Sequence, residues 1–292
     1  MSAVRPAAYP VELQRKVDSY LEDLRFGGEP GTARLEDAMR YSLLAGGKRI
    51  RPVLALATAE ALGRPADEVL PLAAAIEMIH TYSLIHDDLP AMDDDELRRG
   101  QPTCHVAYGE DVAILAGDGL FAEALRLALS DQQGDADRVL SAVCELVAAA
   151  GVRGMVGGQF LDVAPEPAVD LRRLHELKTG ALIAASVGAV LSLEGLNGPA
   201  TIPYRRFAAE LGVVFQIVDD ILDVTGDEAE LGKPRGSDER HGKATYVSVF
   251  GLERARELAR ESHHKARTAL AETDGDSGRL AQIADYVLTR TA

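Results

Sequence analysis

The chain has 292 residues, of which 47% are hydrophobic and 26% charged, so it can form a buried core and is not intrinsically disordered. Its 46 acidic and 31 basic residues give a net charge of −15, which repels nucleic acid and argues against a nucleic-acid partner. The two cysteines, Cys104 and Cys144, are too few for a disulfide framework, a zinc ribbon or an iron–sulfur cluster, and a reducing cytoplasm fits best.

The N-terminal residues 1–10 contain no apolar segment of the kind that a secretory signal needs. The longest apolar run, Ala181 to Leu193, is shorter than the roughly 20 residues that a membrane-spanning helix requires. We therefore expect a buried core helix there and no membrane span.

Apolar residues recur every three or four positions along most of the chain, as in residues 76–85 and 211–222, which is the spacing of helices. Clusters of Gly and Pro interrupt this pattern at 27–31, 63–65, 134, 165–167, 195–203 and 226–242. Helices of roughly 12 to 25 residues fit between them, and no alternation of strands with helices occurs. The prediction is an all-α fold, a single domain over residues 1–292 built as a helical bundle with a central apolar cavity. The polar segment 226–242 is long for a connection and predicts a functional lid.

The first unusual motif closes an apolar helical segment. Asp87 and Asp88 follow residues 77–86, four residues intervene, and Asp93 opens a second acidic run. A lone acidic run is usually a solvated helix face, but these carboxylates adjoin an apolar segment and therefore need counter-cations. His80 lies two turns before Asp87 on the same helical face.

The second motif runs from Phe215 to Asp223. Asp219, Asp220 and Asp223 fall on one face of a helix, with Gln216 one turn earlier. Mg²⁺ prefers oxygen ligands and binds substrate phosphates beside one or two carboxylates. Two such motifs, far apart in sequence, predict opposed helices that share Mg²⁺ ions.

Basic residues accompany these acidic motifs in a chain that is otherwise acidic. They lie in Gly46-Gly47-Lys48-Arg49-Ile50-Arg51-Pro52, in Arg98-Arg99-Gly100, in Lys178-Thr179-Gly180, and at Lys233 and Lys243. Each one alone is an ordinary surface charge. Together with the acidic motifs they predict a site for metal and diphosphate above an apolar cavity.

With these motifs the sequence resembles the trans-isoprenyl diphosphate synthases, and within them the bacterial-type farnesyl diphosphate synthases, from about Leu35 to Tyr286. The resemblance implies the isoprenoid synthase fold, a homodimer and three Mg²⁺ ions in each active site. It also implies head-to-tail transfer, in which dimethylallyl or geranyl diphosphate alkylates isopentenyl diphosphate. The sequence shows no general base, and in the family the departing diphosphate is the usual proton acceptor.

The resemblance further implies a role for each matching residue. Catalytic roles fall to Asp87, Asp88, Asp93, Asp219 and Lys178, and metal binding to Asp87, Asp88, Asp93, Asp219 and Asp223. The allylic diphosphate would be held by Arg98, Lys178, Lys233 and Lys243, with Thr179 and Gln216 beside it. Isopentenyl diphosphate would be bound without metal by Lys48, Arg51, His80 and Arg99. The C-terminal residues 289–292 are less basic than many tails of the family, and we expect no contribution from them.

Product length is expected to depend on Tyr82, five residues before Asp87 and therefore about 7.5 Å away along a helix. A ring at this depth predicts a floor for the growing chain, and the neighbouring Ser83 is too small to form one. The resemblance to farnesyl-forming members of this branch, which carry an aromatic residue at this position, implies that the product stops at C15. Alternatives are a geranylgeranyl or longer-chain synthase, a class I terpene cyclase, and a non-catalytic subunit of a prenyl synthase. A cyclase needs no second diphosphate site, and non-catalytic subunits typically lack one acidic motif.

Overall fold

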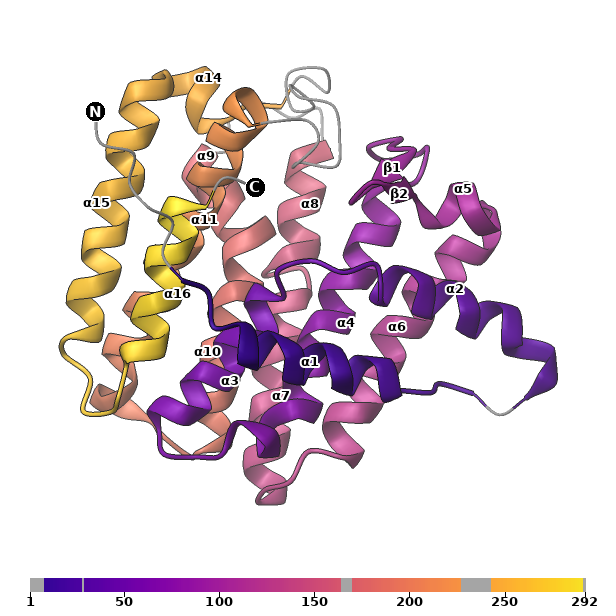
Figure 1. Cartoon of the computed structure of the whole chain (residues 1–292), viewed down its shortest axis with the longest axis horizontal. Helices are drawn as coiled ribbons and strands as arrows, with labels where there is room; N and C mark the ends of the chain where they lie inside the picture. Colours follow the sequence, from indigo (N-terminus) through magenta and orange to yellow (C-terminus); the bar gives the residue numbers. More distant parts are fainter. Residues whose placement is uncertain (1–7, 28, 164–169, 227–242, 291–292) are drawn as a thin grey trace.

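The computed structural model describes residues 8–27, 29–163, 170–226 and 243–290, and it confirms the all-α prediction (Figure 1). The elements are α1 (Val11–Asp23), η1 (Pro30–Thr32), α2 (Ala33–Leu43), α3 (Ile50–Ala61), η2 (Ala66–Val69), α4 (Leu70–Asp87), β1 (Leu97–Arg98), β2 (Gln101–Pro102), α5 (Cys104–Tyr108), α6 (Glu110–Ser130), α7 (Ala136–Ala150), α8 (Met155–Val163), α9 (Leu171–His175), the π-helix η3 (Glu176–Gly180), α10 (Ala181–Leu193), η4 (Gly198–Thr201), α11 (Ile202–Thr225), α14 (Tyr246–Phe250), α15 (Leu252–Leu270) and α16 (Gly278–Thr289).

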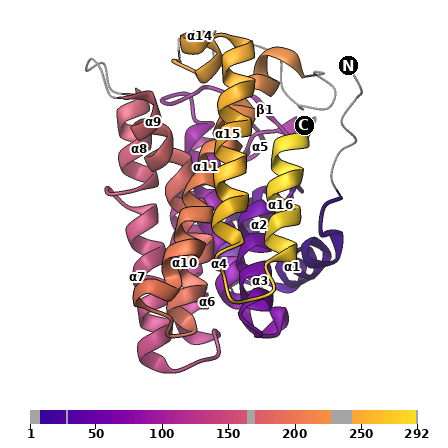
Figure 2. The same ribbon diagram turned by 90° about the vertical axis from the view of Figure 1, so that its left-hand side faces the viewer.

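The centre of the bundle is formed by α3, α4 and α10. These three helices are apolar around most of their circumference and contact one another, and nearly every side chain of α3 and α10 is buried. Figure 1 shows α15 and α16 along one side of the bundle and α5 towards the other, while Figure 2 shows α7 and α8 at the edge opposite α1. The central helices thus place the end of α4 inside the bundle.

A buried arginine fixes the loop before α3. Arg49 is 4% exposed and has a left-handed backbone, with φ of 52°. Its guanidinium donates to Glu77 Oε1 at 2.7 Å, to Asp18 Oδ1 at 2.9 Å and to the Leu43 carbonyl at 2.9 Å. Because burying a charge is costly unless it is paired, this arrangement holds the loop firmly against α4.

α4 ends where the first acidic motif begins. Pro90 has no N–H and disfavours helical geometry in the preceding residue, so the helix cannot continue beyond the aspartates. The chain turns back, and the Asp93 N–H donates to the Asp87 carbonyl at 2.8 Å. The antiparallel pair β1–β2 follows and was not predicted, because two-residue strands leave no periodic pattern in a sequence.

The π-helix η3 lies between two glycines of neighbouring helices. A Cβ atom at Gly158 of α8 would stand 2.2 Å from the backbone nitrogen of Lys178, and one at Gly212 of α11 would stand 3.0 Å from the Gly180 Cα. The helices therefore approach η3 at backbone distance. Lys178 and Thr179 are positioned by this close packing, and π-helical turns are frequent at functional sites.

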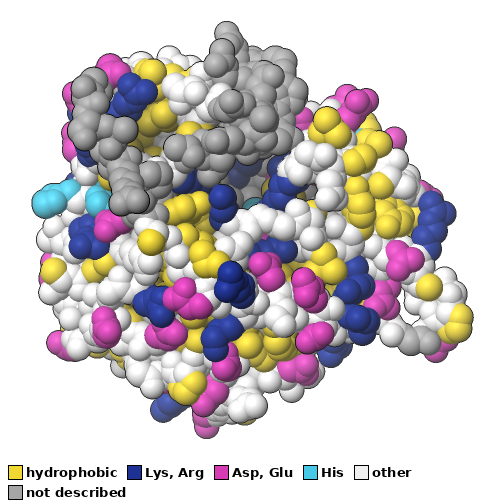
Figure 3. Space-filling view, viewed as in Figure 1, with side chains coloured by type: hydrophobic (Ala, Val, Ile, Leu, Met, Phe, Trp, Pro, Cys, Tyr) yellow, Lys and Arg dark blue, Asp and Glu magenta, His cyan; other side chains and the backbone are white. Residues whose placement is uncertain are grey.

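Three helical stretches are long and apolar enough, by length and composition, to cross a membrane: Ala66–Asp87, Ala136–Val163 and Leu171–Leu193. The sequence expectation considered only the longest apolar run, Ala181 to Leu193, whereas these helical stretches extend beyond such runs through further polar residues. In the fold, the most apolar 18 residues of Ala66–Asp87 are 72% buried and those of Leu171–Leu193 are 56% buried, whereas those of Ala136–Val163 are only 39% buried. Figure 3 shows acidic and basic side chains interspersed over the face that carries α1 and α2.

Candidate active site

A cavity of about 540 Å³ lies between α4, α8, the π-helix η3 and α11. Many of the predicted site residues line it: Arg51, His80, Tyr82, Ser83, Asp87, Arg98, Arg99, Lys178, Thr179, Gln216 and Asp219. Residues that the sequence analysis had not assigned to a site complete its wall: Leu84, His86, Met92, Met155, Val156, Gln159, Phe160, Val163 and Phe215. The structure thus brings residues from both acidic motifs and most of the basic clusters to one cavity.

The carboxylates of the first acidic motif face different partners. Asp87 lines the cavity, and burial raises its pKa to about 6, against the opposing effect of the Lys178 charge. Asp93 accepts from Lys243 Nζ through both oxygens at 2.9 Å. This ion pair joins the first acidic motif to the segment that follows residue 242.

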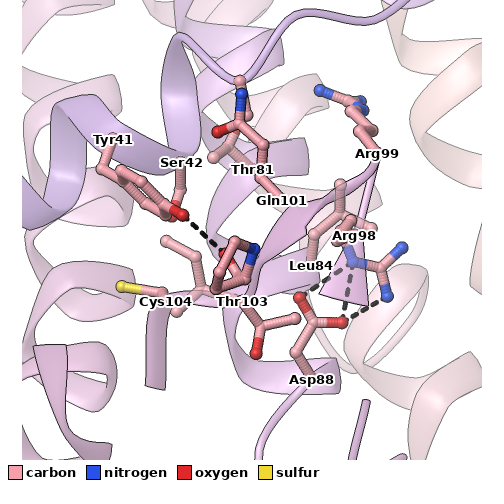
Figure 4. A pocket seen from close by; sticks show the side chains of 13 residues that line it. Tyr41, Ser42, Thr81, Leu84, Asp88, Arg98, Arg99, Gln101, Thr103 and Cys104 are labelled. Carbon is pink, nitrogen blue, oxygen red and sulfur yellow. Dashed lines mark hydrogen bonds and ion pairs between the residues drawn. The ribbon is translucent and has the colours of Figure 1, made fainter. Parts of the chain in front are cut away.

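Asp88 differs from Asp87, because it is 3% exposed and does not line the main cavity. Its carboxylate accepts from Arg98 Nε at 2.7 and 2.8 Å and also pairs with Arg98 Nη2, as Figure 4 shows. Both of its oxygens thus accept from Arg98, and the metal-binding role of Asp88 stays a prediction. Its place in the structure is that of an anchor for the β1 segment.

Arg99 points away from Asp88 (Figure 4) and lies against the glycine loop before α3. A Cβ atom at Gly47, where φ is +119°, would stand 2.7 Å from Arg99 Cζ, so only glycine leaves room for the guanidinium. The Gly46 carbonyl accepts a hydrogen bond from Arg99. Gly47 and the Gly46 carbonyl therefore position the Arg99 guanidinium at the cavity.

The second acidic motif lies on α11, and its carboxylates also divide. Asp219 lines the cavity, with 55% of its side chain exposed. Asp220 is 1% exposed and accepts from Gln216 Nε2 and from the Tyr246 N–H, each at 2.7 Å. Asp223 is 5% exposed and lies one turn further along the helix. Asp219 is therefore the carboxylate of this motif that reaches the cavity.

Asp162 of α8 is a site residue that the sequence analysis missed. Its carboxylate pairs with Lys178 Nζ and lies 3.6 Å from Lys243 Nζ. Burial alone would raise the pKa of Asp162, but the two lysine charges outweigh it and lower the pKa. The available signal was a single carboxylate in the otherwise apolar segment 155–163.

A second group of cations surrounds Phe215. Arg51 is 9% exposed, lies 5.7 Å from the centre of the Phe215 ring, and has its pKa lowered to about 10 by burial. Burial, followed by the Arg51 charge, holds the pKa of His80 well below its usual range, so His80 is neutral at neutral pH. These residues form the basic end of the cavity.

The C-terminal segment also reaches this end, a placement that the low basicity of the tail did not suggest. Arg290 Nη2 lies 3.2 Å from Asp219 Oδ1, and its guanidinium carbon lies 4.3 Å from the centre of the Phe215 ring. Arg290 follows directly after α16, and the packing of α16 against α11 brings it beside Asp219. The number of basic residues in the tail was therefore a poor guide to whether one of them reaches the cavity.

Among the described residues, five predicted site residues do not line the cavity: Lys48, Asp88, Asp93, Asp223 and Lys243. Lys48 is exposed on the glycine loop, where its carbonyl accepts from the Tyr9 hydroxyl at 2.6 Å. Lys233 and the predicted lid fall within 227–242, outside the described residues. Their roles stay predictions.

The donor set suits Mg²⁺ bound together with a phosphate ligand. Within the described ranges, no three Asp, Glu, His or Cys side chains gather closely enough to enclose a metal by themselves. Asp87 and Asp219, however, face one cavity that also contains Lys178 and Arg98. Mg²⁺ typically takes one or two carboxylates and completes its coordination with water and substrate phosphates, so these residues fit it.

The comparisons with known proteins agree with this geometry. The family model described as polyprenyl synthetase matches residues 32–287. The farnesyl diphosphate synthase of Escherichia coli (strain K12) is 47% identical over 266 residues, 87% of this chain and 88% of that protein. The chloroplastic geranylgeranyl pyrophosphate synthase of Catharanthus roseus is 42% identical over 290 residues, 97% and 81% respectively.

A solved structure is similar along almost its whole length. The geranyltransferase from Helicobacter pylori, complexed with magnesium and isoprenyl diphosphate, superposes with a TM-score of 0.84 at 34% identity and covers 97% of this chain and 98% of that one. The matching sequence, the matching fold and the cavity shared by both acidic motifs all point the same way. The chain belongs to the polyprenyl synthetase family and is a prenyltransferase.

Proposed function

We propose that this prenyltransferase condenses isopentenyl diphosphate with dimethylallyl diphosphate and then with geranyl diphosphate, and releases farnesyl diphosphate. The observation that carries the C15 product is the position of Tyr82. Its ring lines the cavity on the α4 turn before Asp87 and packs edge-to-face on Phe121 of α6, with ring centres 5.3 Å apart. A ring supported from behind in this way resists displacement by a growing chain.

The allylic diphosphate would lie between the two acidic motifs. Mg²⁺ bound there, three ions by family resemblance, would neutralise charge on the leaving diphosphate. Lys178, Thr179 and Arg98 face the same space and would hold the diphosphate oxygens. Fixed cations at this position stabilise the negative charge that grows as the carbon–oxygen bond breaks. The apolar side chains of α8 would exclude water from the allylic cation.

Isopentenyl diphosphate would bind at the basic end, where Arg51, Arg99 and His80 line the cavity. Arginine forks suit phosphate oxygens, and a neutral His80 can still donate a hydrogen bond. Arg290 adds a cation there that the sequence analysis did not include. Lys48 would have to turn inward from its exposed position to take part.

A homodimer is proposed with the surface of α6, α7 and α8 as its interface. α6 contacts α7, α7 contacts α8, and their exposed apolar side chains far exceed those of any other neighbouring helices. These side chains are Ile114, Leu115, Leu129, Leu140 and Val147, with Val152 between α7 and α8, and Val156, Phe160 and Val163, which also line the cavity. Many exposed apolar side chains on helices that contact one another favour burial against a partner. A second copy would cover much of the exposed face of the window Ala136–Val163, so we propose no membrane span.

A cytoplasmic location is also proposed. Both cysteines are free thiols, and Cys144 is exposed. An exposed free thiol suits a reducing compartment. Cell fractionation with an antibody to the protein tests this, and recovery in the membrane pellet after a carbonate wash would contradict it.

The product is tested by chromatography of the prenyl alcohols released from the reaction with isopentenyl and dimethylallyl diphosphates. Wild type should give C15, and Tyr82→Ala should give C20 and longer products while condensation continues. Tyr82→Phe is the matched control, because it keeps the ring and should keep C15. A wild type that releases mainly C20 would favour the geranylgeranyl alternative.

The metal site has its own test. Asp219→Ala removes a hard oxygen ligand, and we expect turnover to fall by about 10²–10³. Thermal stabilisation by Mg²⁺ with inorganic diphosphate should be lost in the same variant, because the carboxylate no longer binds the ion. Retention of both turnover and stabilisation would show that Asp219 is not a ligand.

A further inference from the structure

The helix beside the cavity floor has a recess at Gly117 of α6. Gly117 is buried, and a Cβ atom built there would stand 2.2 Å from Nε2, 2.6 Å from Cδ2 and 2.9 Å from Cε1 of His86. No alanine could occupy this position with the imidazole where it is. The His86 ring thus lies in the space that a side chain at position 117 would occupy.

His86 is held in the recess on two sides. Its Nε2 lies 3.1 Å from the Ile114 carbonyl, which can only accept, so Nε2 is the donor. The ring also packs edge-on against Tyr82, four residues earlier on α4, with centres 5.8 Å apart. Both rings face α6 and both line the cavity. His86 adjoins Asp87, but its Nε2 is engaged by a backbone carbonyl, which suits a wall residue rather than a ligand.

Two neighbouring contacts show why the position of this ring matters. Tyr82 is supported by Phe121 on one side and by His86 on another. A side chain at position 117 would fill the space that the imidazole now occupies against α6. The imidazole would then have to turn into the cavity, which it already lines. The clash at Gly117 involves only the end of a side chain with free torsions, so the ring can rotate away without moving either helix.

We propose that Gly117 and His86 together set the width of the cavity next to Tyr82, and that Gly117 is a specificity-determining residue for product length. The glycine keeps the imidazole against α6 and so leaves room for a C15 chain beside it. This proposal rests on the proposed function, since it assumes chain elongation in this cavity. It adds a determinant outside α4 and outside both acidic motifs.

The proposal is tested with Gly117→Ala and the same product chromatography. The methyl group should push the imidazole into the cavity, and the ratio of C10 to C15 product should rise by about tenfold or more, the usual effect of one methylene-sized change in an apolar pocket. Gly119→Ala is the matched control on the same helix, because its Cβ would face Met39 of α2 at 3.0 Å and not the cavity. It should leave the product ratio unchanged.

A double variant separates this role from general damage to the fold. In Gly117→Ala/His86→Ala the ring that causes the blockage is absent, so products should return to C15 or become longer. His86→Ala alone should raise the share of C20, because Tyr82 loses one of its supports, and this variant remains informative if Gly117→Ala does not fold. Any of three results would overturn the proposal. They are an unchanged ratio of C10 to C15 product in Gly117→Ala, products of the double variant as short as those of Gly117→Ala, and unchanged products in His86→Ala.

These outcomes are distinct from a failure of the proposed function. If wild type releases mainly C20, the farnesyl assignment is wrong. The Gly117 proposal is then judged by whether the alanine variant shortens the product relative to that wild type. If the protein condenses no prenyl diphosphates at all, the proposed function is wrong, and the proposal for Gly117 and His86 is then wrong as well.

Discussion

Burial in the fold stabilises the neutral, protonated form of the Asp87 side chain and raises its pKa to about 6 from the usual 3.8. Below pH 3.8 the folded and unfolded chains both carry the proton, and the raised pKa then has no effect on stability. Between pH 3.8 and about 6 the unfolded chain loses this proton while the folded chain keeps it, so the free energy of unfolding falls, and above pH 6 the full penalty remains. Without metal, Asp87 therefore destabilises the protein at neutral pH.

The corresponding prediction concerns Asp87→Asn. In the presence of EDTA, its free energy of unfolding should exceed that of wild type by on the order of 1–3 kcal/mol above pH 7, with a smaller gain at pH 5. Thermal or urea unfolding at several pH values measures this. Asp274→Asn, in an exposed loop, is the control. A gain independent of pH would mean that the titration of Asp87 is not its source.

A second prediction at the residue scale concerns the basic end of the cavity. Arg51→Gln should raise the KM for isopentenyl diphosphate about tenfold or more, because a charge-assisted contact to phosphate is lost, while the KM for the allylic substrate stays close to wild type. Arg290→Gln should act in the same direction. Arg279→Gln, on the outer side of α16 where Arg279 pairs with Glu12, should change neither constant. An effect of Arg51→Gln confined to the allylic substrate would reverse the assignment.

At the scale of the elements, the π-helix η3 is positioned by close backbone contact with its neighbours. It joins α9 to α10, carries Lys178, and packs against α8 at Gly158. Lys178 in turn pairs with Asp162 on α8, so the same two elements are joined by packing and by charge. The position of this cation is therefore a property of the α8–η3 contact.

Gly158→Ala tests that contact. A methyl group 2.2 Å from a backbone nitrogen must push α8 and η3 apart, and we expect a loss of about 1–3 kcal/mol in urea unfolding. Turnover should fall as well, because Lys178 moves with η3. Gly31→Ala is the control, since a Cβ there meets no atom within 4 Å and stability should be equal or slightly higher. Equal stability of the two variants would contradict the close packing.

At the scale of the whole molecule, the apolar surface of α6, α7 and α8 predicts the assembly. Leu140 of α7 is 54% exposed and does not line the cavity. Leu140→Glu should shift the protein from dimer to monomer in size-exclusion chromatography with light scattering, because a charge is costly inside an apolar interface. Val249→Glu, equally exposed at 54% but on α14, should remain dimeric. A wild type that elutes as a monomer would remove the dimer proposal.

Much of this protein was determined by sequence alone, for a local reason. Helical periodicity and Gly/Pro breaks depend on neighbouring residues, so the all-α fold was predictable. Clustered aspartates beside apolar helical segments identified both acidic motifs before any contact was known. The organisation as one domain stays a prediction. Lys178, Thr179 and Gln216 were recognisable as site residues because their motifs are contiguous in the chain.

Only the tertiary structure decided which side chains share the cavity and what each one faces. Asp87 and Asp88 are adjacent in sequence, yet one lines the cavity and the other binds Arg98, because successive residues of a helix point in different directions. Asp162, Arg290 and the recess at Gly117 belong to no acidic or basic motif. Their importance comes from packing between helices that are distant in the chain, and such contacts leave no periodic signal in a single sequence.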